Sequence, residues 1–193
     1  MKEVHVFDID GTVTGIDVLL QCLTSYVGSE VKPEHLTKYS LQDAMYENKF
    51  VTSSKLFCNK EFFNDCAKEY LMNADMKPYF MDYLNMLKRE GHEVYFMTAR
   101  SPEREPLTKQ LFKNLGIPYE NVIHTGHAVN KLDELRELGA THFYDDHPVT
   151  VLSAAEYIEN VYCPKYKYNE HLEAIESIVV FDSWKDLLPY FRV

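Results

Sequence analysis

Three short β-prone stretches each end directly at a polar side chain that is suited to chemistry. They are Val4–Phe7 before Asp8, Glu93–Met97 before Thr98, and Thr141–Tyr144 before Asp145. Helical patterns separate these stretches, and strands that alternate with helices indicate βαβ units and a mostly parallel sheet. Ligands bind such sheets at the carboxyl ends of the strands. We therefore expect the three polar positions to meet at one edge of the sheet.

The remaining elements complete a Rossmann-like pattern. Two further strands are expected over 121–124 and 160–163, and helices over 77–89, 105–115, 131–138 and 150–159. A glycine follows three of these helices closely, and glycine accepts the left-handed conformation that ends a helix. The sequence therefore predicts an α/β fold, with a doubly wound parallel sheet covered by helices on both faces.

Residues 15–76 break this alternation, because they contain only helical patterns. The expected helices are 16–27, 33–39, 41–48 and 53–72, and Leu19, Leu20, Leu23 and Val27 recur at helical spacing. We therefore expect a core of residues 1–14 and 77–193, with residues 15–76 inserted after the first strand as a small helical cap.

Composition excludes several classes of protein. The chain has 193 residues, of which 46% are hydrophobic, and it contains neither a stretch long enough to span a membrane nor a signal-peptide pattern. We expect a soluble, cytoplasmic protein. Its net charge of −10 argues against binding to duplex nucleic acid but permits a small anionic ligand held by a metal ion. The four cysteines form no Cys-x-x-Cys pair, so we interpret them as reduced thiols and expect no cysteine-based zinc site.

Asp8 and Asp10 flank one residue at the end of the first expected strand, and Gly11 follows them. One carboxylate could attack a phosphate while the other moves protons. A bound Mg²⁺ would reduce the repulsion between a carboxylate and a phosphate, and Gly11 would let backbone N–H groups come close to it. An acidic loop or a calcium-type turn is the alternative, since an Asp-x-Asp pair alone is weak evidence.

Further side chains at strand ends and helix starts strengthen the catalytic interpretation. Thr98, with Ala99, could bind a phosphate oxygen, and Lys131 could neutralise the phosphate and orient Asp8. The Asp145-Asp146 pair offers hard oxygen ligands for Mg²⁺. Arg100 could contact the phosphate or form a surface ion pair.

Two other groups of residues have alternative explanations. His124 and His127 have a spacing that permits metal binding, but a polar loop at the rim of the site is the simpler interpretation. Aromatic residues of the cap could stack on a nucleobase, although each is more often part of a helical core. They are Tyr26, Tyr39, Tyr46, Phe50, Phe57, Phe62, Phe63 and Tyr70.

Taken together, these motifs resemble those of the haloacid dehalogenase-like hydrolase superfamily. The matching residues are Asp8-Ile9-Asp10-Gly11-Thr12, Thr98, Lys131 and Asp145-Asp146. The resemblance implies a Mg²⁺-dependent phosphatase in which Asp8 becomes phosphorylated and Asp10 acts as general acid and base. It also implies that the metal is held by Asp8, the backbone carbonyl of Asp10, and Asp145 or Asp146. The residues leave open which member of the last pair binds the metal directly.

A finer resemblance is to the deoxyribonucleotidase branch. It depends on Asp145–Pro148, on Lys165–Asn169 and on Phe181–Trp184, whereas Gly11-Thr12 departs from the aliphatic residues that are commoner in that branch. The resemblance implies a (deoxy)ribonucleoside 5′-monophosphate as substrate. Sugar phosphates, polynucleotide ends and a non-catalytic phospholigand-binding module are the alternatives, and a homodimer stays open.

Overall fold

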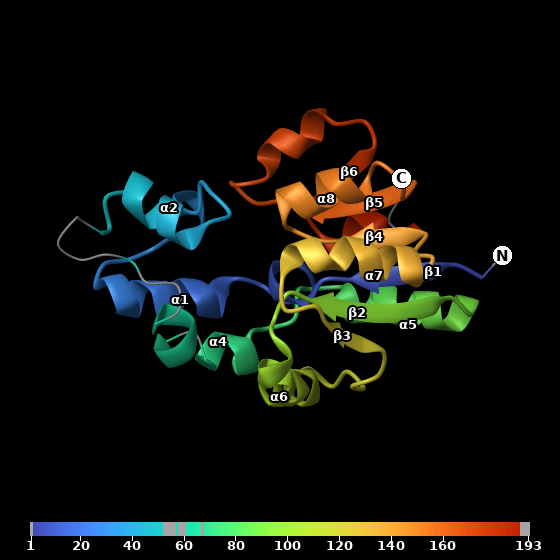
Figure 1. Ribbon diagram of the computed structural model, residues 1–193, viewed down its shortest axis with the longest axis horizontal. Coiled ribbons are helices and arrows are strands. Elements are labelled where there is room, and N and C mark those ends of the chain that lie inside the picture. Colours follow the sequence, from blue (N-terminus) through green and yellow to red (C-terminus); the bar gives the residue numbers. More distant parts are fainter. Residues whose placement is uncertain (1, 52–56, 58–60, 67, 190–193) are drawn as a thin grey trace.

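The computed structural model describes residues 2–51, 57, 61–66 and 68–189. Its centre is a six-stranded, wholly parallel sheet with the strand order β3-β2-β1-β4-β5-β6 (Figure 1). The strands are β1 (Val4–Phe7), β2 (Glu93–Thr98), β3 (Val122–His124), β4 (His142–Tyr144), β5 (Asn160–Pro164) and β6 (Ile178–Phe181). The predicted Rossmann-like α/β class is confirmed, and β6 is an additional edge strand that the sequence patterns did not indicate.

Helices cover both faces of the sheet. They are α5 (Phe80–Glu90), α6 (Glu105–Leu115), α7 (Lys131–Glu137) and α8 (Pro148–Ala154). Side chains alternate across a strand, so Phe7 and Val6 of β1 enter opposite apolar clusters. Phe7 packs with residues of α5 and α6 and with Trp184, whereas Val6 packs with residues of α7 and α8. The sheet is therefore buried on both sides, as a parallel sheet requires.

Two core helices differ from their expected bounds. Helix α8 starts at Pro148 rather than residue 150, because proline suits the first helical turn and the His147 ring accepts the backbone N–H of Thr150. It ends at Ala154 rather than residue 159. Helix α5 begins at Phe80, because Tyr79 before it has a left-handed backbone with φ +66°.

The stretch between β1 and α5 is helical, as expected, but differs in detail. Its helices are α1 (Asp17–Val27), α2 (Leu41–Glu47) and α4 (Lys68–Asn73), with short helical turns at Pro33–His35 and Phe62–Cys66. The predicted helix over 33–39 is wrong, since only a three-residue turn forms there. The predicted helix over 53–72 lies partly outside the described residues. In Figure 1, α1, α2 and α4 lie beyond the carboxyl ends of the strands.

The two connections to this helical stretch run side by side. Thr14 and Met76 form an isolated antiparallel bridge. On either side of it, the Gly15 N–H donates to the Asp75 carbonyl at 2.8 Å, and the Lys77 N–H donates to the Val13 carbonyl at 2.9 Å. The chain therefore leaves the core and returns to it at one point.

Two findings bear on the expectations from composition. Among the described residues, no helix combines the length and the apolar character needed to cross a bilayer. Cys163 is a buried free thiol, whereas Cys58 and the side chain of Cys66 lie outside what the structure describes.

Candidate active site

The strand order brings the two main acidic motifs together. Strands β1 and β4 are neighbours in the sheet, and connections leave them in opposite directions along it. Asp8 follows β1, Asp145 and Asp146 follow β4, and Lys131 begins α7 between β3 and β4. This topological switch point is where open α/β sheets bind ligands.

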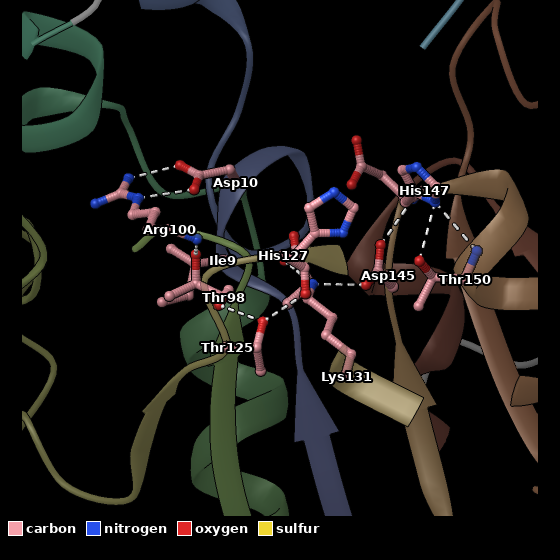
Figure 2. A network of polar contacts seen from close by, with 12 residues as sticks. Ile9, Asp10, Thr98, Arg100, Thr125, His127, Lys131, Asp145, His147 and Thr150 are labelled. Carbon is pink, nitrogen blue, oxygen red and sulfur yellow. Dashed lines mark hydrogen bonds and ion pairs between the residues drawn. The ribbon is translucent and has the colours of Figure 1, made fainter. Parts of the chain in front are cut away.

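Lys131 lies between the two motifs. Its ammonium group donates to Asp8 Oδ1 and, at 2.8 Å, to Asp145 Oδ2 (Figure 2 shows the second contact). All three side chains are buried. The second oxygen of Asp8, Oδ2, is also buried and has no hydrogen-bond partner. Asp8 is thus held in place by one oxygen while the other is left free.

Asp145 and Asp146 have different surroundings. Both oxygens of Asp145 are engaged, Oδ2 by Lys131 and Oδ1 by the His147 backbone N–H at 2.7 Å. Asp146 receives a hydrogen bond from the Tyr168 hydroxyl at Oδ2, and it lines a cavity that Asp145 does not line. Asp145 is therefore bound within the protein, and Asp146 faces the space where a ligand could lie.

Charge in this cluster favours a cation. Oxygens of Asp8, Asp145 and Asp146 lie within 4.8 Å of one another, and all three residues are buried. Burial, and then the neighbouring Asp145, raise the pKa of Asp146 to about 7. Burial also raises the pKa of Asp8, against the effect of Lys131. One ammonium among three carboxylates, with one orphaned oxygen, is a donor set that fits a hard divalent cation.

The segment after β5 supports the site in a way that the sequence reasoning missed. The Tyr168 hydroxyl binds Asp146, the Asn169 amide donates to the Asp146 carbonyl at 3.0 Å, and the Tyr166 hydroxyl donates to the Gly11 carbonyl at 2.7 Å. The sequence signal for these contacts is the Tyr-x-Tyr-Asn run, whose spacing indicates a family resemblance but not a place in the site.

Arg100 is buried and forms an ion pair with Asp10 rather than a surface pair. Its Nε and a terminal nitrogen donate to the two Asp10 oxygens at 2.8 and 2.6 Å (Figure 2). The other terminal nitrogen donates to the Leu71 carbonyl at 2.9 Å and to the Thr108 hydroxyl at 3.2 Å. A bidentate pair of this kind fixes both side chains. Arg100 thus links Asp10 to α4 and α6.

Thr98 ends β2, and its buried hydroxyl accepts the Arg100 backbone N–H at 3.1 Å. Ala99 lines the cavity. His124 and His127 are not brought together as metal ligands among the described residues. His124 contacts Tyr119 at 3.2 Å, and His127 accepts the Val129 backbone N–H at 3.4 Å.

A cavity of about 430 Å³ opens beside the acidic residues. Asp10, Gly11, Asp146 and Arg100 line its core side. Three aromatics of the helical stretch between β1 and α5 also line the cavity, along with several leucines and the cations Lys38 and Arg104; these aromatics are Tyr39, Phe63 and Tyr70. Its volume is in the range of small-molecule sites.

Gly11 is required by close packing against Asp146. A Cβ atom placed there would lie 2.6 Å from Asp146 Oδ2, and the backbone has φ +84°. We expect Gly11→Ala to lower the free energy of unfolding by about 1–2 kcal/mol and to raise the Mg²⁺ concentration that half-saturates the acidic cluster, because the carboxylate must move. Chemical denaturation and a Mg²⁺ titration measure the two effects.

Gly28→Ala is the matched control. Gly28 has φ +76°, but a Cβ atom there would have nothing within 4 Å. Gly28→Ala should lower the free energy of unfolding through backbone strain, without the change in Mg²⁺ dependence. An equal change in Mg²⁺ dependence in both variants would contradict the role of Gly11.

The raised pKa of Asp146 makes stability depend on pH when metal is chelated. A carboxyl whose pKa rises from 3.8 to about 7 on folding stabilises the protein fully below pH 4, and that contribution is lost as the pH rises to 7. In EDTA, we expect the free energy of unfolding to fall by on the order of 2–4 kcal/mol over this interval. Urea denaturation at several pH values measures it. Added Mg²⁺, or the substitution Asp146→Asn, should make the free energy of unfolding depend less on pH. A rise of that free energy with pH in EDTA would contradict the raised pKa of Asp146.

Comparisons with known proteins agree with this geometry. No protein-family profile matches the chain. A protein of Bacillus cereus named "Putative nucleotidase" is 30% identical over 120 residues, which span 61% of each chain. A haloacid dehalogenase-like hydrolase from Streptococcus pneumoniae superposes with a TM-score of 0.65 at 14% identity, covering 99% of both chains. A hydrolase of the same fold family from Deinococcus radiodurans, solved with bound phosphate and sodium, has a TM-score of 0.63 at 12% identity and covers 96% of this chain and 93% of its own. The chain has the haloacid dehalogenase-like hydrolase fold.

Proposed function

We propose that the protein is a Mg²⁺-dependent phosphomonoester hydrolase that acts through a phosphorylated Asp8. The observation that carries this proposal is the state of Asp8. It is buried at the switch point, one oxygen is bound by Lys131, and the other has no partner. A carboxylate fixed in this way is oriented for attack on a ligand in front of it.

The reaction then has two steps. In the first, a carboxylate oxygen of Asp8 attacks phosphorus and the bond to the leaving oxygen breaks. For this step Asp10 must carry a proton and release one of its two contacts with Arg100, and it then gives that proton to the leaving oxygen. In the second, Asp10 takes a proton from water, whose oxygen attacks phosphorus and releases inorganic phosphate and free Asp8. Asp10 lines the cavity, and Arg100 holds both of its oxygens. We assign Arg100 a positioning role toward Asp10 in place of direct phosphate binding.

Phosphate binding falls to groups around Asp8. The Thr98 hydroxyl accepts a backbone hydrogen bond but can still donate its own proton to a phosphate oxygen. Gly11 and Ala99 offer backbone N–H groups beside the cavity. Asp145 and Asp8 raise the pKa of Lys131, despite its burial, so its ammonium stays charged and offsets the charge of the phosphate.

Asp8, Asp146 and the backbone carbonyl of Asp10 would hold the metal. Asp146 is the better direct ligand of the last pair, because Asp145 already binds Lys131 and His147 through both oxygens. Asp145 then orients Lys131. When bound, Mg²⁺ supplies charge stabilisation to the phosphoryl group and lessens its repulsion from Asp8.

A nucleoside 5′-monophosphate is the substrate class that the cavity favours. Its aromatic and aliphatic wall suits a flat base, while Lys38 and Arg104 suit polar groups on the base or the sugar. The name of the Bacillus cereus relative supports the same class. Residues 15–76 would then be the cap that selects the substrate, over a core of residues 1–14 and 77–193. The paired connections at Thr14 and Met76 support this division.

A phosphate-release screen tests the proposal. The purified chain would be assayed with ribo- and deoxyribonucleoside 5′-monophosphates, sugar phosphates and 3′-phosphorylated oligonucleotides, with Mg²⁺ or with EDTA. We expect Mg²⁺-dependent release that is fastest from nucleoside monophosphates. A preference for a sugar phosphate or an oligonucleotide end would overturn the nucleotide assignment, and no release from any compound would favour a non-catalytic phospholigand-binding module.

A further inference from the structure

A second cluster of potential metal ligands lies at the opposite end of the sheet. His5 belongs to β1 and His142 begins β4, and the two residues are in register across the parallel pair. Glu3 precedes β1 and places its carboxylate beside both rings. Glu3 Oε2 lies 3.4 Å from His5 Nε2 and 4.0 Å from His142 Nε2. The phosphatase site at the carboxyl ends uses none of these residues.

Hydrogen bonding assigns the free nitrogen of His142. The Thr141 hydroxyl lies 3.0 Å from His142 Nδ1, and it donates its proton to the Val4 carbonyl at 3.1 Å. With its proton given to Val4, the hydroxyl accepts from Nδ1–H, and in this tautomer the Nε2 lone pair of His142 is unprotonated. That lone pair is available to a ligand on the side of Glu3.

His5 has a buried nitrogen without a partner. The residue is only 2% exposed, and its Nδ1 lies 3.1 Å from the Tyr144 hydroxyl, which in turn lies 2.7 Å from the Tyr83 hydroxyl. The other nitrogen, Nε2, is shielded from solvent and makes no hydrogen bond, although it is on the side of the Glu3 carboxylate. A proton on Nε2 would face Glu3 Oε2 at 3.4 Å without hydrogen-bond geometry, so this atom is poorly satisfied, which is rare for a buried polar group.

We propose that Glu3, His5 and His142 form a second metal site that takes a divalent transition-metal ion of the Zn²⁺ type. The three residues offer one carboxylate and two imidazole ligands whose candidate atoms lie within 4.8 Å of one another. Imidazole nitrogen suits Zn²⁺ and its neighbours, whereas Mg²⁺ prefers oxygen, so the two ends of the sheet select different ions. Three protein ligands leave a fourth coordination position for water. Water can reach this position from the side of Glu3, because the Glu3 side chain is 41% exposed.

The surroundings have the features of a supporting shell. Before any ion binds, His5 Nδ1 lies against the Tyr144 hydroxyl and His142 Nδ1 against the Thr141 hydroxyl, and hydroxyl partners of this kind can orient a metal-ligating histidine. Burial, and then His142 and His92, lower the pKa of His5 to about 4, so its ring is neutral at pH 7. We do not include His92 among the ligands, because its Nδ1 accepts the Glu3 backbone N–H at 3.2 Å.

Binding requires one adjustment of the side chains. The rings of His5 and His142 now stack with centroids 4.1 Å apart and planes at 20°. Both rings must turn about the Cβ–Cγ bond to aim their Nε2 atoms at a shared ion, and this torsion of histidine is broad. A tetrahedral ion with bonds of about 2.0 Å places its ligand atoms about 3.3 Å apart, close to the present separation of Glu3 and His5.

Calorimetric titration with Zn²⁺ in saturating Mg²⁺ tests the site on the full chain. The variants are His142→Gln, Glu3→Gln, Asp146→Asn and, as the matched control, His171→Gln at an exposed histidine. We expect one Zn²⁺ event that raises the Tm of the wild type. It should weaken by about 100-fold in His142→Gln and Glu3→Gln and persist in the other two variants.

Glu3→Gln guards against a loss of Zn²⁺ binding that is caused by misfolding. Glu3 is partly exposed, and its replacement leaves the stacked rings of His5 and His142 in place. Co²⁺ absorbance gives an independent readout of nitrogen ligation. Absence of Zn²⁺ binding in the wild type would overturn the proposal. So would binding of unchanged affinity in Glu3→Gln, or binding that disappears in Asp146→Asn, since the last result places the ion at the carboxylate cluster.

Discussion

Asp8→Asn is expected to lower kcat by roughly 10⁴-fold or more. The amide that replaces the carboxylate is a poor nucleophile, and the phosphorylated residue can no longer form. Phosphate release from the best nucleoside monophosphate of the screen measures the loss. Rapid acid quench with a ³²P-labelled substrate should trap label on the wild-type protein and none on the variant.

The matched control is Asp133→Asn, which removes a carboxylate of α7 whose side chain is 82% exposed. Its activity should equal that of the wild type, because a surface ion pair with Arg136 contributes little. If Asp8→Asn kept activity within about tenfold of the wild type, a covalent step at this residue would be ruled out, and direct attack by water would replace it.

Lys131→Met is expected to have the largest effect on stability. The Lys131 ammonium lies between Asp8 and Asp145 and is buried with them. Removing it leaves like charges facing one another without their cation, which costs about 3–5 kcal/mol for a broken buried pair. Urea denaturation in EDTA at pH 7.5 measures the loss. The deficit should shrink toward pH 4, because protonation of the buried acids removes the repulsion.

Lys109→Met serves as the control for this change. Lys109 pairs with Glu105 at 2.8 Å on the surface of α6, and its side chain is 55% exposed. Its loss should alter the free energy of unfolding by about 0.5 kcal/mol or less. Equal effects of the two substitutions would show that Lys131 does not hold the carboxylates together.

Much of the sheet could be predicted because its strands carry strong local signals. Val4–Phe7 and Glu93–Thr98 are β-prone runs that end at polar residues, and both form strands. Strand β6 was missed because Ile178–Phe181 follows an irregular stretch, and within the described residues a short 3₁₀ turn, Trp184–Leu187, follows it in place of a helix that would begin another βαβ unit. Its pairing with β5 depends on contacts between neighbouring strands, which local patterns do not carry.

The grouping of several candidate residues could be predicted, but their contacts could not, and their roles stay a prediction. Motif order identified Asp8, Lys131 and Asp145, which the structure brings into contact. It did not reveal that Arg100 would be buried against Asp10. A single arginine in the sequence carries no local pattern that separates an exposed position from a buried one. Nor did motif order separate Asp145 from Asp146, since their difference arises because Lys131 binds the first and Tyr168 the second.

The bridge between Thr14 and Met76 has a consequence for how this architecture can vary. Because the two ends of the helical stretch between β1 and α5 are already adjacent, its length can change without shifting the register of any strand. A lineage could therefore exchange the entire segment, or a protein engineer could graft another in its place. The hydrolytic machinery would persist while the accepted compound changed.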